Sequence, residues 1–325
     1  MPAAASLRVG LVGCGRIADR GYLPAFRGLD RIVLTAVADP DPARVARLAE
    51  AAGAIPAFPS ASAMLEAGGI DALVVATPVA AHLEVASLAA RAGIVSLVEK
   101  PPAPDLAGAL ALAELDPAPA FGFNRRFLQG HELAPAIPAG GWLELDLELR
   151  FRRGAWGAHA SRDEALLDAG IHLIDLAAFL AGAAPIAVRD AAVEQERASF
   201  ELELGRARAR IRCATDRPYL ERVEVRDRGG RTVATSRTGQ LRARIGRLRG
   251  GEDPLVASLR RQLRHFAALV RGEQPGELAG PGAAVAALSV VEAAHRSAAL
   301  GGAEVTVGLP SSGEPPALGR VGEAR

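Results

Sequence analysis

Apolar residues in the first hundred positions of the chain occur in short continuous runs, separated by stretches with a helical period. Continuous apolar runs of this length are typical of strands buried on both faces of a sheet. The predicted strands cover 7–12, 32–38, 70–76 and 93–98, and the predicted helices cover 42–52, 61–67 and 80–92. Strands that alternate with helices in this way predict an α/β domain with a doubly wound parallel sheet.

The hydrophobic pattern changes near residue 142, where apolar and charged residues begin to alternate strictly. From Leu143 to Phe151 every second residue is apolar, which predicts a strand with one buried face. Further predicted strands cover 187–193, 199–204, 207–213, 220–227, 232–235 and 303–307, and predicted helices cover 166–180, 255–271 and 282–300. We therefore expect two domains, over 1–122 and 123–309, followed by a disordered tail over 310–325 that is rich in Pro, Gly and Ser.

Composition favours an ordinary globular protein of the cytoplasm. The chain has 325 residues, of which 50% are hydrophobic and 23% charged. No apolar stretch reaches the roughly 20 residues that span a bilayer, and the first residues lack the pattern of a signal peptide. The two cysteines, Cys14 and Cys213, lie far apart and predict neither a disulfide framework nor a zinc cluster. We expect no membrane partner and no metal.

The net charge of +1 argues against a polyanion binder, but the positive charge is unevenly distributed. Fourteen arginines fall between Arg206 and Arg249. Two interpretations stay open: the solvated face of a strand, which we favour, or an anion site for a phosphorylated substrate. A nucleic-acid site ranks below both, and it predicts binding that depends steeply on salt.

A glycine-rich turn follows the first predicted strand, with the sequence Gly13-Cys14-Gly15-Arg16-Ile17-Ala18. Such a turn lets the backbone and the next helix approach a pyrophosphate. Asp39 ends the second predicted strand, where a carboxylate accepts hydrogen bonds from a ribose and repels a 2′-phosphate. We therefore predict NAD rather than NADP, although the nearby Arg44 keeps NADP open. Asp39 has a second interpretation as a turn residue before Pro40.

Lys100 is the single lysine in a chain with thirty-seven arginines. Arginine does not release its proton in the working pH range, whereas a lysine can when its surroundings lower its pKa. Lys100 is therefore a candidate for proton chemistry. Gly13, Asp39, Thr77 and Lys100 all follow predicted strands, and ligands of parallel sheets bind at the carboxyl ends of the strands.

Several motifs together resemble the Gfo/Idh/MocA family of oxidoreductases (glucose-fructose oxidoreductase, inositol dehydrogenase and related enzymes). They span about half of the chain and occur in the order that the family shows. The motifs are the glycine-rich turn, Thr77-Pro78 with His82 downstream, Glu99-Lys100-Pro101, the segment from Phe121 to Phe127, and Asp168-Ala169-Gly170-Ile171-His172-Leu173-Ile174-Asp175.

The resemblance implies a Rossmann domain followed by an α+β domain with an open, mostly antiparallel sheet. It implies that Lys100, Asp168 and His172 are catalytic, with His172 as the leading acid or base. Asp168 and His172 are four residues apart, so on a helix they share a face. The expected cofactor residues are Gly13, Gly15, Arg16, Ile17, Asp39, Thr77, Pro78, His82, Glu99, Lys100 and Asn124. Arg125 and Asp175 are candidate substrate residues, and each also has a structural interpretation; His82 has one as well.

The expected substrates are sugars, polyols or nucleotide-linked sugars, with hydride transfer between the nicotinamide and a secondary alcohol or ketone carbon. The sequence leaves the particular sugar, the direction of reaction and any homo-oligomer open. An alternative function is a sensor or regulator that binds NAD without turnover. Loss of Lys100 or His172 would have favoured the regulator, and both residues are present.

Overall fold

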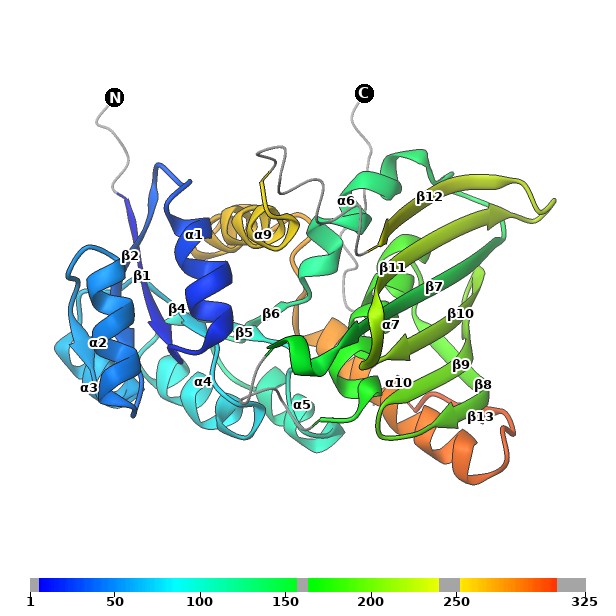
Figure 1. Cartoon of the computed structure of the whole chain (residues 1–325), viewed down its shortest axis with the longest axis horizontal. Coiled ribbons are helices and arrows are strands. Elements are labelled where there is room, and N and C mark those ends of the chain that lie inside the picture. Colours follow the sequence, from blue (N-terminus) through cyan, green and yellow to red (C-terminus); the bar gives the residue numbers. More distant parts are fainter. Residues whose placement is uncertain (1–5, 157–162, 240–251, 309–325) are drawn as a thin grey trace. The chain divides into compact units, whose positions relative to one another are not determined.

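A computed structural model describes residues 6–156, 163–239 and 252–308 of the chain (Figure 1). The chain forms two compact units. The first contains residues 1–124 and 253–284, and the second contains 125–252 and 285–325. The later segment 253–284 thus packs with the N-terminal part of the chain. The predicted disordered tail and most of the basic loop 237–254 lie outside the described residues.

The first unit is built on a six-stranded sheet in which every pairing is parallel. Its order is β3-β2-β1-β4-β5-β6. The strands are β1 (Leu7–Val12), β2 (Ile32–Ala38), β3 (Ala57–Phe58), β4 (Ala72–Val75), β5 (Val95–Glu99) and β6 (Ala120–Gly122). All four residues of β4 are buried, as expected for a central strand that is covered on both faces.

The helices of this unit begin where the sequence supplies capping groups. Asp41, Ser60, Asp105 and Asp253 each accept a backbone N–H of the first turn of the helix that they precede. The helices are α1 (Leu23–Phe26), α2 (Pro42–Ala51), α3 (Ala61–Ala67), α4 (His82–Arg91), α5 (Leu106–Ala113) and α9 (Pro254–Val270). A π-helical turn, η1 (Ala18–Tyr22), precedes α1, and a 3₁₀ turn, η2 (Val79–Ala81), precedes α4.

The second unit contains a seven-stranded sheet of order β12-β11-β7-β10-β9-β8-β13. Only the central pair β7 and β10 is parallel among the pairings described. The strands are β7 (Leu143–Arg152), β8 (Pro185–Val193), β9 (Arg197–Leu204), β10 (Ala207–Ala214), β11 (Asp216–Asp227), β12 (Thr232–Gly239) and β13 (Val305–Thr306). The open, mostly antiparallel sheet and the parallel first sheet confirm the predicted fold class.

One face of the second sheet is apolar. Leu143, Leu145, Leu147 and Leu149 are at most 3% exposed, and α7 (Ile171–Ala181) packs against β7 and β10. A fully buried leucine contributes about 1.5–3 kcal/mol through burial alone. The other helical elements are α6 (Gln129–Leu133), α10 (Pro281–Ala299), the 3₁₀ turns η3 (Asn124–Phe127), η4 (Ala134–Ala136) and η5 (Arg153–Trp156), and the π-helical turn η6 (Leu166–Gly170).

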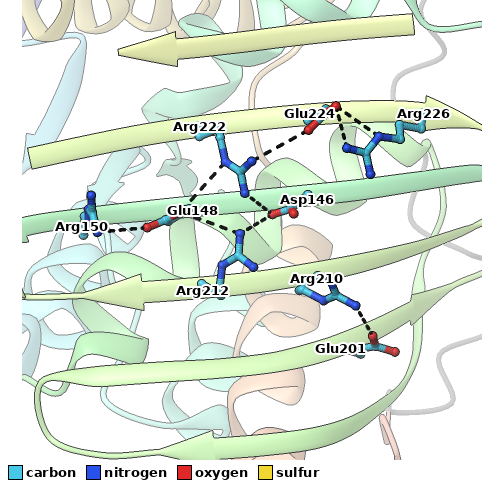
Figure 2. Close-up of polar contacts among 9 residues, drawn as sticks. All are labelled: Asp146, Glu148, Arg150, Glu201, Arg210, Arg212, Arg222, Glu224 and Arg226. Atoms are coloured by element: carbon cyan, nitrogen blue, oxygen red, sulfur yellow. Dashed lines mark hydrogen bonds and ion pairs between the residues drawn. The ribbon is translucent and has the colours of Figure 1, made fainter. Parts of the chain in front are cut away.

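The opposite face of this sheet is an array of matched charges, shown in Figure 2. Asp146 on β7 accepts hydrogen bonds from Arg212 on β10, at 2.8 Å, and from Arg222 on β11, at 3.1 Å. Glu201 on β9 is bound in the same way by Arg189 and by Arg210. We call this surface the charged face. It is formed by outward side chains of the central strands, including Asp146, Glu148, Arg150, Glu201, Arg210, Arg212, Arg222, Glu224 and Arg226.

Candidate functional site

The parallel sheet brings the predicted cofactor residues of the first unit to one edge. Val12, Ala38, Val75 and Val98 are matched in register across neighbouring strands, so four strands end at the same level. Gly13, Asp39, Thr77 and Lys100 each follow the end of one of these strands within two residues. Ligands of open parallel sheets bind at this edge.

The first glycine of the turn is required by its surroundings. Gly13 has a φ of +95°, and a Cβ there would lie 2.5 Å from the carbonyl oxygen of Ala76. Only glycine fits this conformation without strain. Gly15 differs, because a Cβ there would meet no atom within 4 Å. The backbone beside Gly15 is therefore open to a group that approaches closely, as a pyrophosphate does in this type of turn.

Asp39 connects the end of β2 to the glycine-rich turn. One carboxylate oxygen accepts the Cys14 backbone N–H at 2.7 Å, and the other accepts the Asp41 N–H at 2.9 Å. The bond to the Asp41 N–H is a turn contact, which the interpretation of Asp39 as a turn residue requires. A carboxylate has about four lone-pair sites, so both oxygens retain capacity for ribose hydroxyls. The contacts are therefore compatible with both roles.

The arginines near this carboxylate have acidic partners. Arg44, the residue that kept NADP open, forms an ion pair with Asp41 at 3.1 Å. Arg47 forms one with Asp19 at 2.8 Å. A 2′-phosphate would have to compete with these carboxylates for the guanidinium groups, which favours NAD on electrostatic grounds.

His82 ties together the two loops that follow β4 and β5. Its imidazole is buried, with Nε2 3.0 Å from the Thr77 carbonyl oxygen and Nδ1 3.1 Å from the Pro102 carbonyl oxygen. These contacts fit the structural interpretation of His82. The Thr77 Oγ1 is buried and has no hydrogen-bond partner among the described residues. It is thus a polar atom at the predicted cofactor edge that a ligand can satisfy.

Glu99 lies under Lys100 and is buried. It accepts a hydrogen bond from the Tyr22 hydroxyl at 2.6 Å and one from the Lys100 backbone N–H at 3.1 Å. Burial raises the pKa of Glu99 above its ordinary value, while the Tyr22 bond and the charge of Lys100 act against that rise. Lys100 itself is half-buried and stands between β5 and a cis peptide bond to Pro101.

Asn124, the last predicted cofactor residue, lies just after β6. Its side-chain amide nitrogen donates to the Ser258 hydroxyl on α9 at 3.3 Å, and its Oδ1 is buried without a partner among the described residues. The other predicted residues of the turn, Arg16 and Ile17, are half-exposed. No prediction made from the sequence linked α9 to this part of the chain.

In the second unit, Asp168 and His172 lie on consecutive helical elements rather than on one α-helix. The predicted helix 166–180 is wrong in its first turn, because residues 166–170 form the π-helical turn η6 and α7 begins at Ile171. π-helical turns are often found at functional sites. His172 is 7% exposed, and Asp168 forms an ion pair with Arg153 at 3.4 Å.

Arg153 is a candidate that the sequence analysis missed. It lies on η5, fifteen residues before Asp168, and it also donates to the Asp163 carbonyl. The strict alternation of β7 ends just before it, at Arg152. That end of the alternating pattern was the only signal that separated Arg153 from the arginines of the charged face.

The two candidate substrate residues of this unit both have protein partners. Asp175 is buried, and its carboxylate accepts two hydrogen bonds from Arg126, at 2.8 and 2.5 Å. Burial raises the pKa of Asp175, and the Arg126 charge opposes that rise. Arg125 forms an ion pair with the buried Glu221 at 2.9 Å. These contacts fit the structural interpretation of each residue.

Two further features bear on earlier expectations. The Cys14 and Cys213 thiols are buried, and burial raises the pKa of each to about 12, which fits packing groups rather than nucleophiles. Within the described ranges, no helix is long and apolar enough to cross a membrane, and no group of His, Cys, Asp and Glu side chains is arranged to hold a metal ion.

The fold and this edge define a dinucleotide-binding domain of the Rossmann type. Residues 7–117 match the family model described as an oxidoreductase family with an NAD-binding Rossmann fold. The matched residues lie in the first unit and make up about a third of the chain.

The similarity to known proteins extends over part of each relative. The chain is 30% identical over 186 residues to D-apiose dehydrogenase of Paraburkholderia graminis, covering 53% of this chain and 49% of that protein. It is 31% identical over 241 residues to inositol 2-dehydrogenase of Leifsonia xyli, covering 70% of this chain and 65% of that protein. The matches thus span about half to two-thirds of the relatives.

Among solved structures, the fold is similar to that of myo-inositol dehydrogenase from Lactobacillus casei in complex with NAD(H) and myo-inositol. The TM-score is 0.76 with 18% sequence identity, over 96% of this chain and 99% of that one. At this identity the likeness shows a shared fold.

Proposed function

We propose that the chain is an NAD-dependent oxidoreductase that transfers hydride between the nicotinamide and a secondary alcohol or ketone carbon. Its substrate class is a sugar, a polyol or a nucleotide-linked sugar, and its site of action is the cytoplasm. The observation that carries the proposal is the in-register edge where Gly13, Asp39, Thr77 and Lys100 follow four parallel strands. The dehydrogenase relatives support the reaction class.

The residues of the first unit fit the cofactor. The open backbone at Gly15 suits the pyrophosphate, the Asp39 carboxylate suits the adenosine ribose, and the Thr77 hydroxyl offers an unpartnered polar atom. NAD, when bound, supplies the group that accepts or returns a hydride. Gly13, Arg16, Ile17, Pro78, Glu99 and Asn124 complete the proposed binding set.

Removal of a hydride from a secondary alcohol also requires removal of the hydroxyl proton. His172 is the proposed base, because an imidazole exchanges a proton near neutral pH. Asp168, held by Arg153, orients the imidazole or binds a substrate hydroxyl. Lys100 donates a hydrogen bond to the reacting oxygen and stabilises the charge that develops on it. In the reverse direction the same groups return the proton.

Calorimetric titration of the cofactor-free protein with NAD, NADH, NADP and NADPH tests the proposal. We expect binding of NAD and NADH, and weaker binding of the phosphorylated pair. A panel of free sugars, inositols and nucleotide-linked sugars is then screened for a change in absorbance at the nicotinamide band. Binding of none of the four cofactors would refute the proposal, and binding without turnover of any of these substrates would favour the regulator.

A further inference from the structure

A buried row of three polar side chains lies beneath Lys100 in the first unit. The Gln262 side-chain amide donates to the Tyr22 hydroxyl at 3.4 Å, and that hydroxyl donates to Glu99 at 2.6 Å. Glu99 in turn accepts the backbone N–H of Lys100. Gln262 and Tyr22 are fully buried, and Glu99 is 8% exposed. We call Gln262, Tyr22 and Glu99 the buried bridge.

The bridge joins three distant parts of the chain. Tyr22 ends the π-helical turn after the glycine-rich turn, Glu99 ends β5, and Gln262 lies in the middle of α9. Close packing fixes α9 against the segment that carries Tyr22, since a Cβ at Gly21 would lie 2.6 Å from the Leu259 side chain. Leu259 and Gln262 are three residues apart on α9, so both face the same segment.

Simple packing does not account for these residues. Phenylalanine and leucine would fill the positions of Tyr22 and Gln262 without burying polar atoms, which cost free energy unless they are hydrogen-bonded. The Glu99 side chain also packs against Gly122, because a Cβ at that glycine would lie 3.0 Å from the Glu99 carboxyl carbon. A larger residue at position 122 would displace the carboxyl group that accepts the Lys100 N–H.

We propose that Gln262, Tyr22 and Glu99 are positioning residues for Lys100, through which α9 fixes the backbone at the only lysine. Two contacts carry this inference. Glu99 binds the Lys100 N–H directly, and Tyr22 donates to the other oxygen of the same carboxylate. The Tyr22 donor stabilises the anionic form of Glu99, and a carboxylate accepts a backbone N–H more strongly than a neutral group does.

The proposal rests on the proposed function only for the importance of Lys100, and its test requires no substrate. Because Lys100 is the single lysine, protein grown with ¹⁵N-lysine and purified without a lysine-containing tag gives one backbone amide signal and one Nζ signal. The amide signal reports on the hydrogen bond to Glu99. The Nζ signal reports on the surroundings of the Lys100 side chain.

The variants are Tyr22→Phe, Gln262→Leu and Glu99→Gln, with Ser96→Ala as a control. Ser96 is buried on the same strand as Glu99 but lies outside the bridge. We expect the Lys100 amide signal to move in all three bridge variants. We also expect the Nζ signal to move in Glu99→Gln, because that variant changes the group next to the Lys100 backbone. Both signals should stay at their wild-type positions in Ser96→Ala.

Unchanged Lys100 signals in folded Tyr22→Phe and Gln262→Leu proteins would overturn the proposal. If those two variants do not fold, Glu99→Gln decides alone, because it keeps the size and shape of the side chain. Calorimetry of the wild-type protein with NAD separates the two hypotheses. Displaced Lys100 signals in the variants, with no NAD binding by the wild-type protein, would refute the dehydrogenase and keep the bridge. Normal NAD binding by the wild-type protein, with Lys100 signals unchanged in the variants, would refute the bridge and keep the dehydrogenase.

Discussion

The two sheets of this protein place their polar side chains differently. In the parallel sheet the central strand β4 is buried along its length, and polar groups such as Asp39 and Lys100 follow the strand ends. In the second sheet the charged groups stand in the middle of strands, and one carboxylate such as Asp146 is shared by two arginines. We therefore expect position along the strand, rather than charge density, to distinguish the proposed ligand-binding charges from the structural ones.

The arginine-rich segment illustrates this difference. Its described arginines at 210, 212, 222 and 226 all lie within 4 Å of carboxylates on their own or neighbouring strands (Figure 2). For these four arginines the pairing fits the interpretation as a solvated strand face, while the arginines from 242 to 249 lie outside the described residues. An anion that binds there must displace carboxylates that are already in contact with the arginines.

The largest expected effect is that of replacing Lys100, because a positive charge alone is not sufficient for the role proposed for this lysine in turnover. We expect Lys100→Arg to lower turnover about a hundredfold or more, because arginine keeps the charge but changes the geometry and the exchange of the proton. The affinity for NAD, measured by calorimetry, should stay within a few-fold of wild type. The matched control is Arg210→Lys on the charged face, which should leave turnover unchanged. Wild-type turnover in Lys100→Arg would remove Lys100 from the chemistry.

The two glycines of the turn are expected to respond differently to the same substitution. Gly13→Ala should lower the free energy of unfolding by about 1–3 kcal/mol, because it combines a positive φ with a contact to the Ala76 backbone. Gly15→Ala should leave unfolding nearly unchanged and weaken NAD binding, since its Cβ would occupy open space. Thermal melts and calorimetry measure both. Equal NAD affinity of wild type and Gly15→Ala would argue against a close pyrophosphate.

Asp39 tests whether a charge at a strand end binds a ligand or only the backbone. We expect Asp39→Ala to weaken NAD binding about tenfold and to relax the preference against NADP, because it removes both the acceptor and the repulsion. If Asp39 serves only the turn, through Cys14 and Asp41, both cofactors should lose affinity equally. The ratio of the two dissociation constants is therefore the decisive quantity.

Local patterns predicted most of the elements because burial imposes them directly. Continuous apolar runs predicted the parallel strands, and the alternation of apolar and charged residues predicted β7 and its neighbours. The helix α5 was not predicted, since Leu106–Ala113 is apolar nearly throughout and has no distinct polar face. The strand β6 was not predicted either, because its three residues are too few for a period.

Residues of the site could be predicted from the sequence where they belong to a local motif. They could not be predicted where they depend on contacts between segments that are distant in the sequence. The glycine-rich turn and Glu99-Lys100-Pro101 can be recognised in the sequence. The contact between Tyr22 and Glu99 spans 77 residues, and that between Tyr22 and Gln262 spans 240. No periodicity encodes such pairs, so the role of α9 in the first unit follows only from the structure.

On the charged face, single substitutions should have small effects. Asp146→Asn removes the carboxylate shared by Arg212 and Arg222, and we expect it to lower the free energy of unfolding by about 1 kcal/mol or less. The loss should shrink in high salt, which screens exposed charges. Urea unfolding at low and high ionic strength measures it, with the exposed Glu203→Gln as a control. A loss as large as that in Gly13→Ala would show that the array is a structural core rather than a solvated surface.

The smallest expected effect concerns how the stability of the fold changes at low pH. The paired carboxyl group of Glu201 and the buried carboxyl group of Glu99 act on it in opposite directions. Hydrogen bonds from Arg189 and Arg210 lower the pKa of Glu201 in the folded chain below its ordinary value, despite partial burial. The ionised Glu201 therefore stabilises the fold above pH 4.5, and this contribution is lost as the pH falls through the lowered pKa of the folded chain. The pKa of the buried Glu99 is raised in the folded chain, so ionised Glu99 lowers the stability of the fold. That stability is recovered as the pH falls from the raised pKa toward 4.5.

Urea unfolding at several pH values between 3 and 7 should therefore show a smaller loss of stability at low pH in Glu201→Gln than in wild type. Glu99→Gln should show a steeper loss over the upper part of that range, because the opposing contribution is gone. If both variants followed the wild-type curve, neither carboxyl would have a pKa that differs between the folded and unfolded chain, and the contrast between strand-end and mid-strand charges would rest on geometry alone.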